Sequence, residues 1–256
     1  MSRFRMTEMD PNRLQEHILG TYISLRFGIG IITFAFPIAV YLAGHFQGFP
    51  LQGSLSAYYW AGMDGHYWAR TWFVGGLFAV AAALYLYKGF TRAENIALNL
   101  AAVFGLGVAI FPTSRAVDAV GDKFNPHGFS AVSLFVCLAY VVWFRARDTL
   151  PLLPPGRDGT NHTQVAKYTH LYRIVSLVML ASPLTAYVLN SFLGEGGSYI
   201  FFIESAGVWA FASYWWIKSR ELEQSTAERK ALAGKIAIEP VGLHKAKAVP
   251  AEEPVQ

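Results

Sequence analysis

Six long apolar stretches alternate with short polar stretches along this chain. The apolar stretches cover residues 24–44, 67–87, 94–112, 128–146, 172–192 and 198–217. Each is close to the roughly 20 residues that an α-helix needs to cross a ~30 Å hydrocarbon core. One such run would also fit a buried helix of a soluble protein, but six in one chain favour a membrane protein. The pattern predicts an all-α fold, a polytopic membrane helix bundle of six transmembrane helices.

Composition agrees with this pattern. Hydrophobic residues make up 54% of the 256 residues and charged residues only 15%, whereas soluble domains carry about 25% charged residues. The single cysteine, Cys137, lies inside the fourth stretch, so no disulfide can form within the chain. Its expected role is that of a small apolar residue.

Lysine and arginine are concentrated in alternate connections, which sets the expected orientation. One side carries Arg3, Arg5, Arg13, Lys88, Arg92, Arg145, Arg147, Arg157, Lys167, Lys218 and Arg220. The other side carries only Arg115 and Lys123. The positive-inside rule then predicts a multi-pass protein of the bacterial cytoplasmic (inner) membrane with both termini in the cytoplasm. The net charge of +4 comes largely from these positions, so it does not indicate nucleic acid.

The same pattern divides the chain into three parts. Residues 1–22 form an expected cytoplasmic N-terminal segment, 23–218 the transmembrane domain, and 219–256 a partly disordered cytoplasmic tail. Small residues recur every four positions in two neighbouring stretches, and we expect these faces to meet. They are Gly75, Ala79 and Ala83 in the second stretch and Ala101, Gly105 and Ala109 in the third. Thr91 and Glu94 fit a capping box at the start of the third helix.

Polar residues gather on the expected periplasmic side, in a short interfacial segment between the first two helices and at nearby helix ends. The candidate ligand-binding residues are Ser56, Tyr58, Tyr59, Asp64, His66, Arg70, His127, Ser130 and Glu204. Glu204 lies six residues into the last stretch, where a charged group is costly and suggests function. Five aromatic residues of 54–70 fit an interfacial aromatic belt. We therefore expect an interfacial anchor that also covers a polar site.

Two interpretations of these residues stay open. His66, His127 and Glu204 are candidate ligands of a metal such as zinc, with Glu204 or Asp64 as catalytic base. Alternatively, the histidines bind water or backbone and Glu204 pairs with Arg70. A haem is disfavoured, because no histidine lies deep inside a stretch.

The chain resembles an uncharacterised family of bacterial six-span integral inner-membrane proteins. The resemblance rests on the motifs "SLSAYY" (54–59), "FVGGLFAV" (73–80), "YKGF" (87–90), "LNLAAVFGLGVAIFPT" (98–113) and "ESAGVWAF" (204–211), and on the His127 segment. It implies the six-span fold and no particular activity. More remotely, Ser56 is similar to the serine of the superfamily that contains alkaline ceramidases and adiponectin receptors, which use zinc to hydrolyse lipid amides. Trp60 stands where that superfamily has a histidine.

Three functions follow as hypotheses. The first is an inner-membrane protein whose periplasmic polar pocket binds a lipid or small amphiphile. The second is a metal-dependent membrane hydrolase that acts on a lipid-like amide or ester. The third is a structural subunit of a membrane complex. The expected partners are membrane lipids, together with protein partners or further copies of the chain.

Overall fold

A computed structural model of the chain describes residues 11–62, 65–113, 125–156, 159–193 and 197–236. The regular elements in these residues are α1 (Pro11–Phe46), η1 (Ser56–Tyr59), α2 (Trp68–Leu86), α3 (Arg92–Ile110), α4 (Pro126–Tyr140), η2 (Val141–Arg145), η3 (Ala146–Leu152), α5 (His162–Leu193), α6 (Tyr199–Ser225) and α7 (Ala227–Leu232). Within the described residues, six helices are long and apolar enough to cross a membrane. The predicted six-span helix bundle is confirmed.

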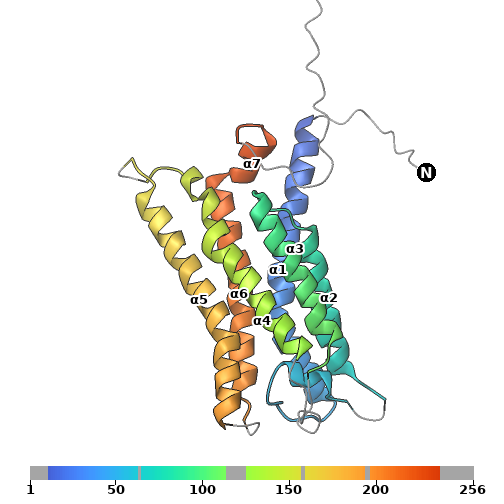
Figure 1. Cartoon of the computed structure of the whole chain (residues 1–256). Helices are drawn as coiled ribbons and strands as arrows, with labels where there is room; N and C mark the ends of the chain where they lie inside the picture. Colours follow the sequence, from blue (N-terminus) through green and yellow to red (C-terminus); the bar gives the residue numbers. More distant parts are fainter. Residues whose placement is uncertain (1–10, 63–64, 114–124, 157–158, 194–196, 237–256) are drawn as a thin grey trace, which may run out of the picture.

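The long helices pack in chain order, and α6 returns to α1. Each of α1 to α6 contacts the helix that follows it, and α1 and α6 also pack together. Figure 1 shows the helices running roughly alongside one another. We call one end of the bundle the α7 end, because it holds α7 and the start of α1. The opposite end, which holds the end of α1 and the 3₁₀ helix η1, is the η1 end.

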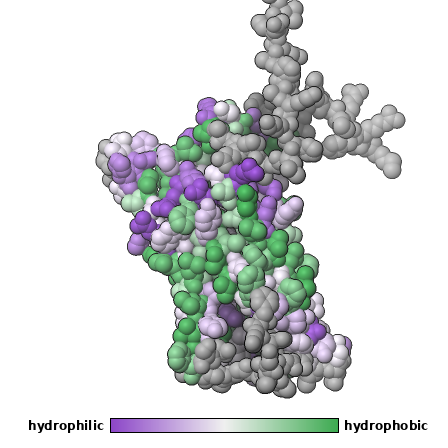
Figure 2. Space-filling model, in the orientation of Figure 1, coloured by the Kyte–Doolittle hydropathy of each residue, from purple (hydrophilic) through white to green (hydrophobic). Residues whose placement is uncertain are grey.

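The outer surface of the bundle is apolar, as a lipid-facing surface should be. Large apolar side chains such as Tyr187 and Phe192 are exposed on it. In Figure 2 hydrophobic residues cover the middle of the visible face, and hydrophilic residues gather toward the α7 end. This distribution fits a bundle whose sides contact hydrocarbon, because lipid chains are as apolar as the side chains they meet.

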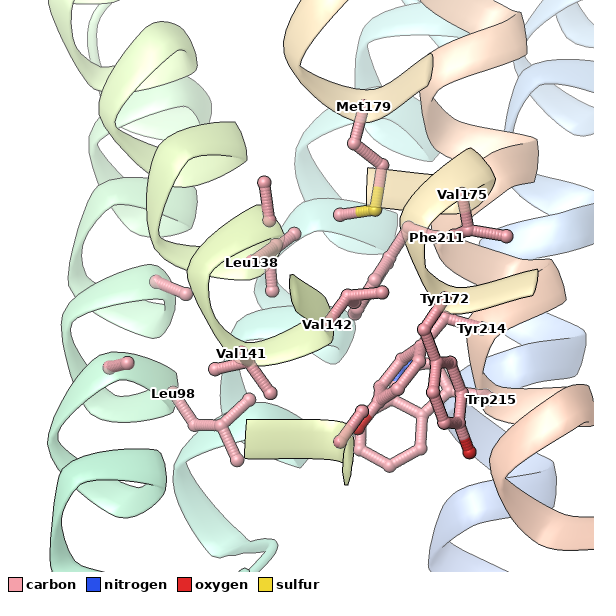
Figure 3. Close-up of a cluster of buried hydrophobic side chains, with 14 of the residues drawn as sticks. Leu98, Leu138, Val141, Val142, Tyr172, Val175, Met179, Phe211, Tyr214 and Trp215 are labelled. Atoms are coloured by element: carbon pink, nitrogen blue, oxygen red, sulfur yellow. The ribbon is translucent and has the colours of Figure 1, made fainter. Parts of the chain in front are cut away.

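Aromatic side chains fill the core on the side of the α7 end. Tyr172 of α5 and Tyr214 and Trp215 of α6 are almost completely buried, and they lie together with Val142 in Figure 3. Tyr87, just after α2, meets Trp215 edge to face, with 4.9 Å between ring centroids. Such pairs add about 0.5–1.5 kcal/mol to the free energy of burial. The aromatic contacts therefore join α5, α6 and the end of α2.

The prediction that the small-residue faces of the second and third helices meet is correct for the residues of α3 but wrong for Gly75 and Ala79 of α2. Ala101, Gly105 and Ala109 of α3 are buried, but Gly75 and Ala79 of α2 are exposed. Because α2 packs on both α1 and α3, its register turns other small residues inward. They are Gly76, which faces the Phe36 ring of α1, and Ala81, whose Cβ lies 3.6 Å from the Cβ position at Gly105.

The capping box at the start of α3 is present. The Oγ1 of Thr91 accepts a hydrogen bond from the Glu94 N–H at 3.2 Å. The Glu94 carboxylate accepts one from the Phe90 N–H at 2.9 Å. The Glu94 amide lies in the first turn of α3, where a helix leaves its N–H groups unpaired, and the Phe90 amide lies just before the N-cap. The two side chains therefore fix the beginning of α3.

The helical part of the chain extends past the expected limits of the transmembrane domain. α1 begins at Pro11, within the expected cytoplasmic segment 1–22. α6 continues to Ser225, so the expected boundary between residues 218 and 219 falls inside it. Glu221, Leu222 and Ser225 are buried. This part of the tail therefore belongs to the packed bundle.

Candidate functional site

The η1 end is closed by residues 47–62, which we call the cap. Its Gly53 carbonyl accepts a hydrogen bond from the Phe201 N–H at 3.0 Å, which ties the cap to the first turn of α6. Tyr58 lies under the cap with no exposed surface. Its ring fits against Gly44 of α1, where a Cβ would come 2.5 Å from the Tyr58 Cε1 atom. The cap is thus packed on the bundle by an aromatic side chain.

Glu204 binds the cap rather than a cation. Its Oε2 atom accepts a hydrogen bond from the Leu55 N–H at 2.7 Å, and the Ser56 N–H also donates to the carboxylate. These amides lie at the beginning of η1, where a helix leaves its N–H groups without partners. A carboxylate is well placed there, because charge-assisted hydrogen bonds are about twice as strong as neutral ones. The structure therefore brings the predicted residues Ser56 and Glu204 together.

Arg70 has different partners from the one expected. Its Nε donates to the Tyr59 carbonyl at 2.6 Å. Its guanidinium carbon lies 4.6 Å from the ring centroid of Tyr59, 5.4 Å from that of Trp60 and 4.3 Å from that of Tyr67. Across the described residues, Arg70 and Glu204 form no ion pair with each other. Arg70 thus stabilises the cap through cation–π contacts.

The aromatic residues of the segment 54–70 fall into two groups. Trp68 is 52% exposed and Tyr67 39% exposed, as residues of an interfacial belt should be. Tyr58 is completely buried, and its hydroxyl accepts a hydrogen bond from the Gln52 N–H at 3.3 Å. Its role is therefore that of a core residue beneath the cap.

The two histidines of the expected metal set occupy different surroundings. The Nδ1 atom of His127 lies 2.8 Å from the Phe111 carbonyl oxygen, and the side chain is buried at the start of α4. His66 is exposed. In the part of the chain that the structure describes, no three His, Cys, Asp or Glu side chains are placed to hold a metal ion. His66, His127 and Glu204 are not gathered into such a group among the described residues, and metal binding by them stays a prediction.

The remaining predicted residues complete this picture. Ser130 is buried on α4, and its Oγ atom would lie 2.5 Å from a Cβ at Gly107 of α3. It therefore marks a close α3–α4 contact. Asp64 lies outside the described residues. Ligand binding by the predicted residues and zinc-dependent hydrolysis both stay predictions, and metal analysis of the purified protein tests the latter.

The most deeply buried charges lie at the α7 end and were not expected from the sequence. Lys218 and Glu221 of α6 form an ion pair at 2.6 Å with almost no solvent exposure. The Lys218 ammonium also donates to Thr149 Oγ1 at 2.6 Å and to the Ala146 carbonyl at 2.9 Å. Tyr172 donates to the same carboxylate at 3.3 Å. The sequence feature that could have indicated this pair is the Lys-x-x-Glu spacing, which places both side chains on one helix face.

This network explains how the fourth helix ends. After Tyr140 the α-helix changes into a π turn and then the 3₁₀ helix η3. Such changes disturb the regular backbone ladder. The Ala146 carbonyl at the start of η3 is bound by Lys218. The ammonium of α6 therefore holds η3 in place.

A second buried ion pair joins α1 to α7. Arg26 is 3% exposed, and its guanidinium pairs with Glu228 and donates to Ser219 Oγ at 3.4 Å. The Tyr87 phenol lies beside it. Among the described side chains, the anion paired with Arg26 is Glu228.

A shallow, open groove lies between α1 and α6, directly beside Arg26. We call it the α1/α6 groove. It is lined by Arg26, Phe27, Gly30, Ile31, Trp215, Trp216 and Ser219. Apart from Arg26 and Ser219, these residues are apolar or aromatic. The indole N–H of Trp215 has no hydrogen-bond partner. The groove thus combines an apolar wall with a polar end.

The chain was compared with protein-family models, with curated proteins and with solved structures, and none of them matches.

Proposed function

We propose that this integral membrane protein belongs to a bacterial inner membrane, has both termini in the cytoplasm, and binds a membrane lipid or small amphiphile. The observation that carries the proposal is the α1/α6 groove. It lies between two helices that are long and apolar enough to span a membrane. Its apolar wall suits an acyl chain. Its polar end lies at the α7 end, which the distribution of lysine and arginine assigns to the cytoplasm.

The η1 end, where the sequence predicts the ligand, offers less room. The carboxylate of Glu204 is bound by the cap, and Arg70 contacts the cap's Tyr59 and Trp60 rings. A ligand there would have to displace contacts within the protein. A ligand in the α1/α6 groove would instead lie along an open, mostly apolar surface and would leave the contacts of the cap intact.

The test compares lipid retention by variants of the two ends. Protein purified in mild detergent is examined by native mass spectrometry with added phosphatidylglycerol. We expect Gly30→Leu to lose the bound lipid, because the longer side chain fills the groove. A Cβ at Gly30 meets only the Cβ of Trp215, at 3.5 Å, and the Ala212 carbonyl, at 3.9 Å. Gly30→Ala should therefore fold, and it shows whether position 30 tolerates a side chain.

The matched control is Gly28→Leu, because Gly28 is on the same helix, is not part of the groove lining and has nothing within 4 Å of its Cβ position. It should retain the lipid. If Glu204→Gln loses the lipid while Gly30→Leu keeps it, the ligand lies at the η1 end, as the sequence predicts. If the wild-type protein retains no lipid, the proposed function is wrong.

A further inference from the structure

We infer that the ligand of the α1/α6 groove is an anionic phospholipid, whose phosphate displaces Glu228 from Arg26 and so releases α7. This inference rests on the proposed function and adds two things to it, the chemical class of the headgroup and a conformational response. Its basis is the position of the Arg26–Glu228 ion pair, which lies at the polar end of the groove and also joins α1 to α7.

The headgroup class follows from the burial of Arg26. A buried guanidinium is stable only when it is paired, because an unpaired buried charge loses its hydration without compensation. Glu228 now provides that pairing. A group that takes its place must therefore be an anion. Phosphate suits this role, because guanidinium binds its oxygens through two parallel hydrogen bonds.

The surroundings of the groove favour the same class. Trp216, which lines the groove, is 51% exposed. Arg220 follows it by one helical turn on α6 and is also exposed. A headgroup bound at Arg26 of α1 would therefore have Arg220 of α6 as a second cation nearby. Basic pockets between transmembrane helices on the cytoplasmic side are typical binding places for anionic headgroups.

The attachment of α7 makes its release feasible. α7 is only six residues long, Ala227–Leu232. Besides Glu228, it is held by Lys230, whose Nζ donates to the Leu152 carbonyl at 3.1 Å and to the Ser225 carbonyl at 2.9 Å. The buried Ala227 and a 3.5 Å hydrogen bond from Gln15 Nε2 to the Leu232 carbonyl complete its attachment. Thr226, between α6 and α7, has φ +51°. This left-handed conformation is strained for a β-branched residue, and release of α7 would relieve it.

The test uses two lipids with the same acyl chains, phosphatidylglycerol and phosphatidylcholine, bound to the full-length protein in detergent. Both lipids carry a phosphodiester, but only phosphatidylcholine places a quaternary ammonium beside it. We expect at least about tenfold tighter binding of phosphatidylglycerol, because this ammonium is repelled by the cations Arg26 and Arg220. Arg26→Gln should remove this preference and leave weak binding of both lipids. Glu228→Gln should strengthen phosphatidylglycerol binding, because the competing carboxylate is gone. Glu223→Gln, which neutralises an exposed carboxylate of α6, should change nothing.

The second readout is hydrogen exchange of the α7 amides. Phosphatidylglycerol should accelerate exchange in Ala227–Leu232, and phosphatidylcholine should not. If both lipids bind equally and Gly30→Leu abolishes both, the headgroup inference is wrong while the proposed function stands. If phosphatidylglycerol is preferred but α7 exchange is unchanged, the displacement of Glu228 is wrong. If neither lipid binds, the proposed function itself fails.

Discussion

Removal of the Lys218 ammonium tests the role of the buried network at the α7 end. Lys218→Met keeps the length of the side chain and deletes its charge. The change removes a donor from the Ala146 carbonyl and leaves the Glu221 carboxylate with the Thr149 and Tyr172 hydroxyls alone. The Ala146 carbonyl and Thr149 Oγ1 both lose their donor, and two such buried acceptors at about 1–3 kcal/mol each give a loss of about 2–6 kcal/mol. Broken buried ion pairs cost about 3–5 kcal/mol, which agrees.

The loss is measured as the change in the free energy of unfolding in mixed micelles with a rising fraction of dodecyl sulfate, followed by tryptophan fluorescence. A second variant, Lys218→Met with Glu221→Gln, removes both charges. It should recover at least about 1 kcal/mol of the loss, because contacting residues are coupled by about 0.5–3 kcal/mol. A double variant as unstable as the sum of the two single variants would refute the coupling.

The chain contains a matched control for this experiment. Arg145 and Asp148 form an ion pair with the same i,i+3 spacing, but both side chains are 30% exposed and the N–O distance is 3.4 Å. Asp148→Asn should therefore cost only about 0–1 kcal/mol. If Lys218→Met and Asp148→Asn destabilise the protein equally, burial does not set the strength of the Lys218 network.

Three further predictions concern the η1 end and the topology. Gly44→Ala should destabilise the protein by about 1–3 kcal/mol through overpacking against Tyr58, whereas Gly28→Ala should not, as thermal unfolding of both variants will show. Glu204→Gln should accelerate hydrogen exchange of the Leu55 amide by at least about tenfold, because a charged acceptor contributes about 1.5–3 kcal/mol; unchanged exchange would show that the carboxylate does not hold the cap. Green fluorescent protein fused after residue 256 should fluoresce if the C-terminus is cytoplasmic, and a dark, translocated fusion would reverse the expected orientation.

Much of the fold could be predicted because membrane helices are encoded locally. A run of apolar residues forms its own backbone hydrogen bonds, so length and hydropathy alone identify each span. The capping box of Thr91 and Glu94 was predictable for the same reason, because the residues involved are three positions apart. The sequence showed that α2 carries small residues, but it did not show which of them face the neighbouring helices. Which face of α2 turns inward depends on its two neighbours, and the sequence of α2 does not contain that information.

The partners of the buried charges could not be predicted. The sequence marked Glu204 as unusual, but its partner is the backbone of the cap, which lies about 150 positions earlier and carries no charge to suggest the pairing. Lys218 looked like one more cytoplasmic cation. Its burial follows from the length of α6, which continues inside the bundle to Ser225.

The sequence by itself determined the class of protein and the six spans, since each depends on the free energy of placing local segments in lipid or water. The orientation is a prediction from the same local pattern. The tertiary structure decided which polar groups meet. It directs Glu204 to the amides of η1, places Lys218 among α6, η3 and α5, and joins Arg26 to α7 beside the α1/α6 groove. These contacts link residues far apart in the chain, and only the packed arrangement of the helices brings them within hydrogen-bonding distance.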